Sequence, residues 1–343
     1  EFRRVLFRSE YDTLMRFVLA VSTLMAAGAL TLSAAKTTDI YFIDTEGGQA
    51  TLIVAPSGQT LMVDAGWPGN SGRDAIRIAA AAKAAGVKKI DTLLTTHFHD
   101  DHVGGVGSLI KRLPVASFVD YGPSVENNGK YPMEYAEAFA TGEHHVVKPG
   151  DKIALKGTDT TILIGAGQHI ERKGDANPYC AGLTQQSGEG GENSQSLGFV
   201  LQFGKFRFAD LGDVLYNGEM ALECPENKVG KVDLLITTHH ATHVPPKSQW
   251  GLAPRVVVMN NGARKGGKPE AWSQISQSPG LEDLWQLHYA IEGGAEHNVA
   301  DAKIANLNER ECPGDYIKVS ASEDGSFTVF NKRNKYMKNY GAK

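Results

Sequence analysis

The chain has few cysteines and lacks the motifs that use a thiol or hydroxyl nucleophile. Only three cysteines occur in 343 residues, and no two have the C-x-x-C spacing. This argues against a thiolate metal site and against a redox dithiol. The sequence also has no G-x-S-x-G turn, which argues against covalent catalysis by serine. After residue 35, no stretch reaches the roughly 20 apolar residues that a membrane-spanning helix needs.

The chain has no excess of positive charge. Its net charge at pH 7 is −4, and it has no basic stripe with interleaved aromatic residues. A mildly acidic surface does not favour a polyanionic partner in general, although a locally basic cleft can still bind one.

The first 35 residues are typical of material outside the mature protein. We expect residues 1–14 to be cloning or sequence-assembly carry-over, with Met15 as the true start. A basic residue, an apolar stretch and the small residues 33–35 then predict a secretory signal peptide over residues 15–35. An uncleaved membrane anchor is the alternative. Cleavage would leave a chain of net charge −5, periplasmic or secreted and not attached to the membrane.

The remaining residues, 36–343, show no boundary typical of a linker, so we expect one α/β domain. Short apolar runs predict buried strands, and longer runs with helical periodicity predict helices. A basic tail at the end is expected to be solvated. The expected strands are 38–43, 51–54, 60–64, 90–95, 233–239, 255–259, 316–319 and 326–330; the helices are 74–85, 108–113, 245–252 and 279–288; 292–307 is irregular and 332–343 is the tail.

Three histidines and a carboxylate follow the strand at 90–95 within six residues. His97, His99, Asp101 and His102 lie where this strand passes through a glycine-rich turn into a helix. Strand ends of this kind commonly hold ligands in α/β proteins. Imidazole nitrogens and carboxylate oxygens suit zinc, manganese or iron. The pattern therefore predicts a metal site, and a histidine-rich surface loop is the alternative.

The strand that leads into this site has an internal echo. Residues 91–97 and 233–239 are both acidic-led apolar runs that end in Thr-Thr-His. Successive strand residues point to opposite faces, so we expect one of His239 and His240 to reach the metal. The echo favours His239, which leaves His240 to hold another ligand or to contact substrate.

The stretch H-F-H-D-D-H resembles the signature of the metallo-β-lactamase superfamily. Residues 42–50 and 63–66 resemble the first two blocks of this domain in the DNA-uptake competence-protein branch. The resemblance implies a four-layer αββα sandwich with a metal site at one edge of its two sheets. It also implies that Asp64 is a structural carboxylate rather than a ligand; an ordinary turn aspartate is the alternative.

The resemblance also implies a ligand set for one or two metal ions, with Zn²⁺ expected and Mn²⁺ or Fe as alternatives. The run 204–213 resembles the superfamily strand that ends in Gly-Asp, which makes Asp213 the bridging carboxylate, with Asp210 as a rival. In members with one zinc ion, the aspartate at the position of Asp101 can act as the catalytic base. The implied ligands are His97, His99 and Asp213 for one metal, and Asp101, His102, His239 and Asp213 for the other.

One expected ligand is missing. Many members supply another histidine about twenty residues before the bridging aspartate, where this chain has Asn193 in the block Asn193-Ser194. The competence branch has a similar block. His169 is the alternative substitute, although a lone loop histidine is more often solvated.

Two further features bear on function. Arg264, Lys265 and Lys268 cluster in a glycine-rich loop that could hold an anionic substrate group, or could be a solvated turn. An exported protein is expected to form a disulfide, and three pairings are open. We favour Cys180 with Cys224, because both lie next to proline in loops that flank the strand before Asp213.

The expected activity is hydrolysis by metal-activated water. Phosphodiesters are the first substrate class, on the competence resemblance; an ester, a lactone or a β-lactam is the alternative. Two alternatives come from other functional classes: a non-catalytic metal-binding protein of the same fold and a diiron redox protein. We expect a small-molecule or phosphodiester substrate and no obligate protein partner.

Overall fold

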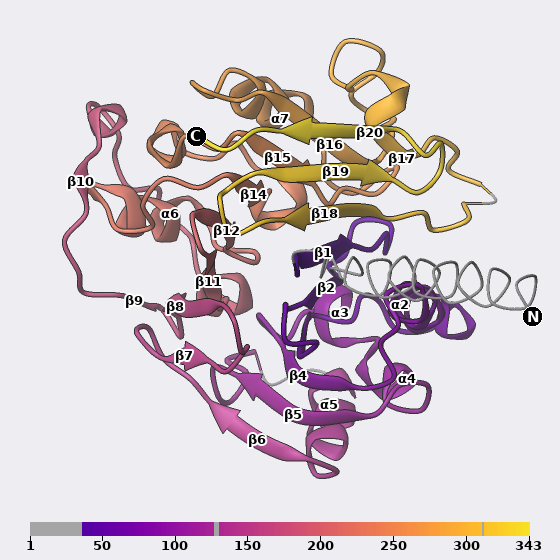
Figure 1. Cartoon of the computed structure of the whole chain (residues 1–343). Helices are drawn as coiled ribbons and strands as arrows, with labels where there is room; N and C mark the ends of the chain where they lie inside the picture. Colours follow the sequence, from indigo (N-terminus) through magenta and orange to yellow (C-terminus); the bar gives the residue numbers. More distant parts are fainter. Residues whose placement is uncertain (1–35, 127–129, 311) are drawn as a thin grey trace, which may run out of the picture. The chain divides into compact units, whose positions relative to one another are not determined.

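Strands of two to seven residues, most of them apolar and buried, form two large β-sheets in the unit Thr37–Lys343 (Figure 1). The computed structural model describes residues 36–126, 130–310 and 312–343. The predicted carry-over and signal peptide, residues 1–35, lie outside the described residues. Among the described residues, no helix combines the length and apolar character needed to cross a membrane.

The first sheet has the order β20-β19-β18-β1-β2-β3-β4-β5-β6. Its strands are antiparallel from β20 to β3 and parallel from β3 to β6. The strands are β1 Thr38–Phe42, β2 Thr51–Val54, β3 Thr60–Val63, β4 Ile90–Leu94, β5 Val115–Asp120, β6 Glu143–Val146, β18 Ile317–Ala321, β19 Phe327–Asn331 and β20 Met337–Tyr340.

The second sheet has the order β17-β16-β15-β14-β12-β11-β8-β7, with β9 paired to β8. Its centre, from β12 to β17, is parallel. The strands are β7 Lys152–Ile153, β8 Asp159–Gly165, β9 Gln168–His169, β11 Gly198–Phe203, β12 Phe206–Asp210, β14 Leu234–Ile236, β15 Val256–Met259, β16 Asp283–His288 and β17 Ile304–Asn306; β10 Asp175–Ala176 pairs with β13 Glu226–Asn227.

Helices complete the predicted αββα arrangement. One core contains residues of both sheets together with α2 and α4, and a second contains outer residues of the second sheet together with α6 and α7. Burial of these two apolar layers is what holds the four layers together. The helices are α2 Arg73–Ala84, α3 Asp100–Val103, α4 Val106–Leu109, α5 Lys130–Phe139, α6 Tyr216–Glu223 and α7 Pro269–Ser276; short 3₁₀ helices are η1 Asn70–Gly72, η2 Pro178–Cys180, η3 Glu192–Gln195, η4 Thr238–Ala241, η5 Lys247–Leu252 and η6 Asp301–Lys303.

Five local predictions were wrong. Residues 292–307 are not irregular throughout, because they contain η6 Asp301–Lys303 and the buried strand β17 Ile304–Asn306. Residues 283–288 form the central strand β16 rather than a helix, and all six residues are buried. The tail is not simply solvated, because it contains the edge strand β20, whose Tyr340 is 2 % exposed. The expected helix 108–113 is replaced by the earlier turns α3 and α4. Residues 247–252 are 3₁₀ rather than α-helical.

The internal echo corresponds to matching strands, one in each sheet. Asp91 at the start of β4 accepts a hydrogen bond from Thr60 N (3.0 Å), and Asp233 before β14 accepts one from Arg207 N (3.0 Å). Thr95 N and Thr237 N donate in the same way to the next strand, at Val119 and Val258. β4 and β14 therefore deliver their Thr-Thr-His ends in equivalent surroundings.

Candidate metal centre

Asp64 fixes the loop after β4 through hydrogen bonds to Thr96. This buried carboxylate accepts hydrogen bonds from Thr96 N (2.8 Å) and Thr96 Oγ1 (2.7 Å). Ala65 N also donates to His102 O (2.7 Å). The histidine-rich segment is consequently held against the end of β3.

Four buried side chains converge on one point beside this loop. Asp101, His102, Asp213 and His240 can each offer one ligand atom, and these atoms all lie within 4.8 Å of one another. His102 Nε2 is 3.3 Å from both Asp101 Oδ2 and Asp213 Oδ2. His240 Nε2 is 3.1 Å from Asp101 Oδ2 and 3.3 Å from Asp213 Oδ2. We call this set the four-residue cluster.

Asp64 also sets the orientation of His102. Its Oδ2 lies 2.7 Å from His102 Nδ1. A carboxylate at Nδ1 holds a proton on that nitrogen, so Nε2, which faces the cluster, is the nitrogen that would give up its proton to a cation. Asp64 thus lies behind a cluster member and is not part of the cluster itself.

His97 and His99 lie beside the four-residue cluster. His97 Nε2 is 3.1 Å from His99 Nδ1 and 4.0 Å from Asp213 Oδ2. The other nitrogen of His99, Nε2, lies 3.5 Å from Glu126 Oε2. Asp213 is therefore shared between the four-residue cluster and this pair of histidines.

The assignment of His239 rather than His240 to the site of Asp101 and His102 is corrected by the structure. β14 ends at Ile236, and His239, His240 and Ala241 all adopt positive φ, at 48°, 55° and 57°. The alternation of side chains along a strand no longer applies in this left-handed turn. His240 enters the four-residue cluster, while His239 Nε2 lies 3.8 Å from Asp213 Oδ2.

The left-handed turn is held by a glycine-rich loop. Gly267 N donates to His240 O (2.9 Å), and Lys268 N donates to Ala241 O (3.0 Å). A Cβ atom at Gly266 would lie 2.2 Å from His240 O, so only glycine allows this approach. A left-handed non-glycine residue costs about 1 kcal/mol or more, and such strain concentrates at functional sites.

The charges of the cluster support one another. Burial alone would raise the pKa of Asp213, but His102 and His240 outweigh it and hold this pKa well below its usual range. Burial likewise opposes the charged form of His102, but Asp213 and Asp101 raise its pKa well above the usual value. In the metal-free protein, the carboxylates are therefore ionised, and His102 holds a proton that a cation would displace.

Two buried oxygens are available as further ligands for a cation. Within the described part of the chain, Asp213 Oδ1 and Asn193 Oδ1 are buried and have no hydrogen-bond partner. Buried oxygens without a donor are costly. Asp213 belongs to the four-residue cluster, and Asn193 contacts His239 through its Nδ2 (3.3 Å), so both side chains lie near N and O donors of the kind that suits zinc or a similar divalent ion.

Of the basic loop residues, only Lys265 lies at this centre. Its ammonium contacts Asp101 Oδ2 and lies 4.7 Å from the centre of the Trp67 ring. Arg264 pairs with Glu309 and Lys268 pairs with Glu292 at the surface. Lys265 is therefore the loop residue that lies beside the four-residue cluster, and the roles of Arg264 and Lys268 in substrate binding stay predictions.

Two other candidates lie apart from the cluster. His169 ends β9, and its Nδ1 lies 3.6 Å from Glu171 Oε1. Asp210 is fully buried and accepts hydrogen bonds from Gln49 Nε2 (2.8 Å) and Gly212 N (3.0 Å). Burial and the charge of Asp64 raise the pKa of Asp210 to about 7.

Sequence reasoning missed four residues that hold the histidines. Glu126 contacts His99, and Asn260 Nδ2 lies 3.0 Å from His240 Nδ1. His243 Nδ1 lies 3.2 Å from His239 Nδ1, and Glu219 Oε1 lies 3.3 Å from His243 Nε2. The pattern T-H-H-x-T-H at residues 238–243 is a sequence signal that could have identified His243. No local sequence pattern distinguishes Glu126, Glu219 or Asn260.

The predicted disulfide is confirmed. Cys180 pairs with Cys224, and Cys312 is free.

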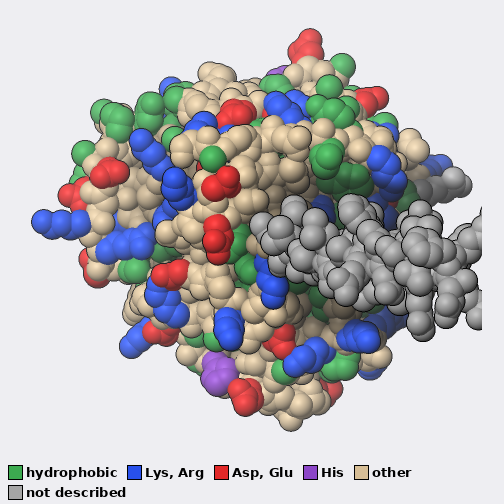
Figure 2. All heavy atoms as spheres, viewed as in Figure 1, with side chains coloured by type: hydrophobic (Ala, Val, Ile, Leu, Met, Phe, Trp, Pro, Cys, Tyr) green, Lys and Arg blue, Asp and Glu red, His purple; other side chains and the backbone are tan. Residues whose placement is uncertain are grey.

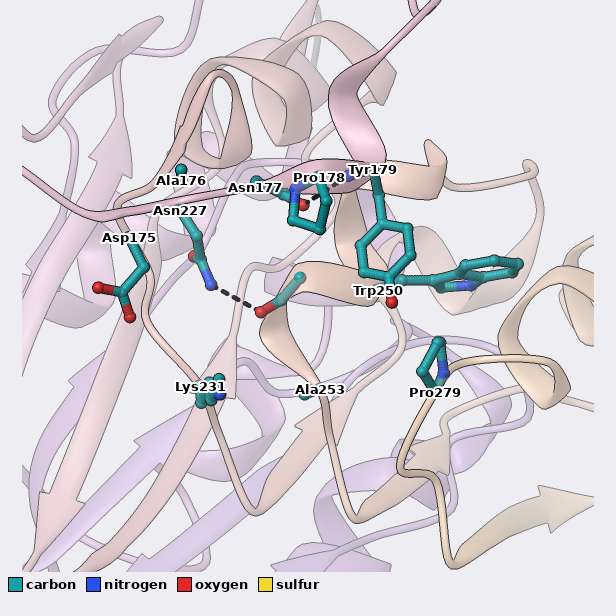
Figure 3. A pocket seen from close by; sticks show the side chains of 11 residues that line it. Asp175, Ala176, Asn177, Pro178, Tyr179, Asn227, Lys231, Trp250, Ala253 and Pro279 are labelled. Atoms are coloured by element: carbon teal, nitrogen blue, oxygen red, sulfur yellow. Dashed lines mark hydrogen bonds between the residues drawn. The ribbon is translucent and has the colours of Figure 1, made fainter.

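Beside the disulfide lies a separate cavity of about 320 Å³ (Figure 3), where the rings of Tyr179 and Trp250 meet edge to face with their centres 5.6 Å apart. Asp175 and Lys231 lie on its other side and are both exposed. None of the predicted metal or substrate residues lines this cavity.

Residues 43–200 match the model of the metallo-β-lactamase superfamily. The match contains the loop after β4 and Asn193, and the αββα layers described above agree with it.

The curated relatives include hydrolases. A protein from Vibrio vulnificus (strain YJ016) named hydroxyacylglutathione hydrolase 2 is 30 % identical over 105 residues, 29 % of this chain and 36 % of that protein. The alignment thus spans about a third of that relative's length. A UPF0173 metal-dependent hydrolase of Anaeromyxobacter dehalogenans is 25 % identical over 263 residues, 74 % of this chain and 82 % of that protein.

Among solved structures, the metallo-β-lactamase fold protein YhfI from Bacillus subtilis matches with a TM-score of 0.44 and 11 % identity. The match covers 73 % of this chain and 95 % of that one.

Proposed function

We propose that this protein, whose residues 43–200 match the model of the metallo-β-lactamase superfamily, is a metal-dependent hydrolase. The observation that carries the proposal is the convergence of Asp101, His102, Asp213 and His240 at separations of 3.1–3.3 Å. Burying two carboxylates and two imidazoles together carries a desolvation cost, and such clusters of ionisable groups are typical of functional sites.

The four-residue cluster would hold a divalent cation, and we take Zn²⁺ as the first choice, with Mn²⁺ or Fe as alternatives. When bound, such an ion lowers the pKa of a water molecule and polarises the bond to be broken. Asp101 and Asp213 supply the negative charge, and Asp64 keeps Nε2 of His102 directed inward. Asp101 is buried and keeps its pKa well below the usual range, so it remains ionised.

Lys265 offers a cationic contact to an anionic group of the substrate. In the metal-free protein, its ammonium pairs with Asp101, and a cation in the cluster would compete for that carboxylate. Lys265 is then free to bind a negative group beside the reacting bond. A phosphodiester fits this arrangement and agrees with the resemblance to the competence-protein branch, so we place it first. On the face shown in Figure 2, basic and acidic side chains are interspersed, which supports a small substrate rather than a long polyanion.

An acyl ester is the second candidate. The relatives named hydroxyacylglutathione hydrolase, among them the protein from Vibrio vulnificus, favour this candidate. Lys265 would then contact a carboxylate of the substrate. Lactones and β-lactams belong to the same candidate class, because their tetrahedral oxyanion needs the same positive surroundings.

A substrate panel separates these candidates. The metal-free protein and its Zn²⁺ and Mn²⁺ forms are assayed with bis-p-nitrophenyl phosphate, p-nitrophenyl acetate, an acyl lactone and nitrocefin. We expect metal-dependent turnover of the phosphodiester, with a higher KM in the Lys265→Ala variant. Turnover of only the ester, lactone or lactam would move the assignment to the second candidate, and no turnover of any substrate would favour a non-catalytic protein. An iron signal without hydrolysis would favour a redox role.

We also propose that the protein is exported and that its domain works in the periplasm or outside the cell without an obligate protein partner. The signal-like segment at 15–35 and the Cys180–Cys224 disulfide support this, because disulfides persist mainly in oxidising compartments. Fractionation of the native host tests it. Recovery of the protein from the cytoplasm with Met15 still attached would contradict export.

A further inference from the structure

We propose that the cavity beside the disulfide (Figure 3) is a binding site for a neutral saccharide, with one pyranose ring packed against Tyr179 and Trp250. None of the candidate metal ligands lines this cavity. The inference therefore goes beyond the proposed function and does not depend on it.

The first argument is that the cavity is preformed. Its volume of about 320 Å³ lies within the range of small-molecule sites in proteins. The buried amide of Asn177 accepts a hydrogen bond from Tyr179 N (3.1 Å) and donates one to Ser248 O (2.8 Å). Trp250 Nε1 donates to Gln274 O (3.0 Å), which fixes the indole. The segments that carry the two rings are therefore ordered before a ligand binds, and this reduces the entropy lost on binding.

Further restraints hold the same walls. The disulfide Cys180–Cys224 ties η2, which carries one of the rings, to the end of α6. A Cβ atom at Gly251 would lie 2.5 Å from Asn177 Nδ2, so η5, which carries the other ring, approaches this amide only because glycine is present. Asn227 Nδ2 donates to Gly251 O (2.9 Å), the hydrogen bond that crosses the cavity wall in Figure 3. The shape of the cavity is thus fixed from several segments of the chain.

The second argument is the set of polar groups that remain available to a ligand. The amides of Asn177 and Asn227 are engaged in holding the walls. By contrast, the Tyr179 hydroxyl, the Asp175 carboxylate and the Lys231 ammonium have no hydrogen-bond or ion-pair partner among the described residues. Asp175 and Lys231 are exposed and lie across the cavity from the two rings. The cavity therefore offers an aromatic wall and, opposite it, one acceptor and one donor.

The third argument is charge, which disfavours a charged ligand of either sign. Tryptophan and tyrosine rings commonly bind organic cations. Here, however, Lys247 Nζ already lies 5.4 Å from the centre of the Trp250 ring, and Lys231 is a second cation at the wall. An anionic ligand would meet Asp175 at the same wall. Asp175 and Lys231 balance each other, so a neutral ligand meets no net repulsion.

A pyranose ring satisfies both walls. The face of the ring that carries C–H bonds is apolar and packs flat against an indole or a phenol. The hydroxyl groups at its rim both donate and accept hydrogen bonds, so one edge can donate to Asp175 and accept from Lys231. A purely apolar ligand would leave these polar groups without partners. A zwitterion would gain little from two exposed charges that water screens.

The test measures saccharide binding to the protein as purified and again after treatment with chelator, so that the result is separated from the metal centre. Maltotriose, cellotriose and triacetylchitotriose are titrated by calorimetry, and saturation transfer from protein to sugar is recorded by NMR. We expect at least one of them to bind with a Kd of about 1 mM, because a hexose ring has about twelve non-hydrogen atoms and binds with ordinary ligand efficiency. The transfer should be strongest at the C–H protons of one ring.

Variants locate the binding site. Trp250→Ala removes the indole and should weaken binding about tenfold or more. Ala176→Trp, at an exposed position of β10 in the cavity wall, fills the cavity without removing a ligand contact and should have an effect at least as large. Lys231→Met removes one donor and should weaken binding about 2- to 10-fold. Tyr336→Ala, at an exposed tyrosine outside the cavity, is the matched control and should bind like the wild type. Circular dichroism of each variant establishes that it is folded.

The outcomes decide the inference without reference to hydrolysis. Binding that Trp250→Ala and Ala176→Trp both weaken, with Tyr336→Ala unchanged, supports it. A wild type that binds none of the three saccharides would overturn it, as would binding that neither cavity variant weakens. L-tryptophan serves as a zwitterionic probe, and its binding in place of the saccharides would also overturn the inference, because the ligand would then be of another class.

Discussion

Each histidine that faces Asp213 from the end of β14 or from α3 has its other ring nitrogen held by a neighbour. His102 Nδ1 meets Asp64 at 2.7 Å, His240 Nδ1 meets Asn260 at 3.0 Å, and His239 Nδ1 meets His243 at 3.2 Å. Fixing one nitrogen decides the direction of the other, so the centre is organised before a cation arrives.

Asp64→Asn tests this preorganisation. The substitution removes the charge behind His102, and an amide no longer enforces the tautomer that leaves Nε2 unprotonated. We expect zinc affinity at the four-residue cluster to fall about 10- to 100-fold, as measured by chelator competition. Asp175→Asn, at an exposed position, should leave the affinity unchanged. An affinity equal to that of the wild type in folded Asp64→Asn protein would show that Asp64 only supports the loop.

Asp210 provides a test that depends on pH. Its pKa is about 7 in the folded protein, raised by burial from an ordinary value of 3.8. The folded state therefore binds the proton more tightly between these values, and stability falls as pH rises through this window. Asp210→Asn does not titrate, so its stability relative to the wild type should increase from pH 5 to pH 8. Urea unfolding with chelator present measures this, and a difference that does not change with pH would refute it.

The candidate metal ligands were easier to predict from the sequence than the residues that contact their other ring nitrogens. The spacing of His97, His99, Asp101 and His102 pointed to a metal site, and the Thr-Thr-His echo found the second strand. It misassigned His239 and His240, because a run of three left-handed residues has no signature in residues that are not glycine. Glu126, Glu219 and Asn260 were missed because their contacts form between segments far apart in the chain.

At the scale of elements, most strands of the two sheets were predictable, whereas β16 and β20 were not. β1 to β4 and the hairpin β18–β19 follow the expected ranges closely. β16 was taken for a helix because a parallel strand covered on both faces shows no alternation of polar and apolar residues. The charged tail concealed β20, since lysines on an edge strand also protect it from pairing with other chains.

The docking of β20 can be tested at Tyr340. This side chain is 2 % exposed, stacks on Phe327 at 4.7 Å and donates a hydrogen bond to Asp283 Oδ2 (2.6 Å). Tyr340→Ala should lower the free energy of unfolding by about 3 kcal/mol, the cost of removing a buried aromatic ring. Asn339→Ala, at the exposed position before it, should change it by less than about 0.5 kcal/mol. Equal effects of the two variants would mean that the tail is not docked.

At the scale of the whole molecule, the disulfide encloses a segment of the chain that contributes to the candidate metal centre. The Cys180–Cys224 bond closes a segment of 44 residues that includes Asn193 and Asp213. Cross-linking a loop of this length stabilises the folded state by about 4 kcal/mol through the entropy of the unfolded chain.

Removal of this bond gives a prediction for the whole domain. The Cys180→Ala/Cys224→Ala variant should lose about 4 kcal/mol in chemical unfolding relative to the wild type. Under denaturing, non-reducing conditions, the wild type should show one reactive thiol, which belongs to Cys312. Three reactive thiols in the wild type would contradict the disulfide.

The central claim is that the end of β4 and the end of β14 together hold a metal ion through Asp213. The measurement that tests it most directly is elemental analysis of bound metal, after zinc reconstitution and removal of excess ion, on the wild type and Asp213→Asn. This substitution keeps the size of the side chain and removes the charge that His102 and His240 share. The account predicts about one equivalent or more in the wild type and a loss of about tenfold or more in the variant. Folded wild-type protein that retains no metal, or an Asp213→Asn variant that retains all of it, would contradict the account.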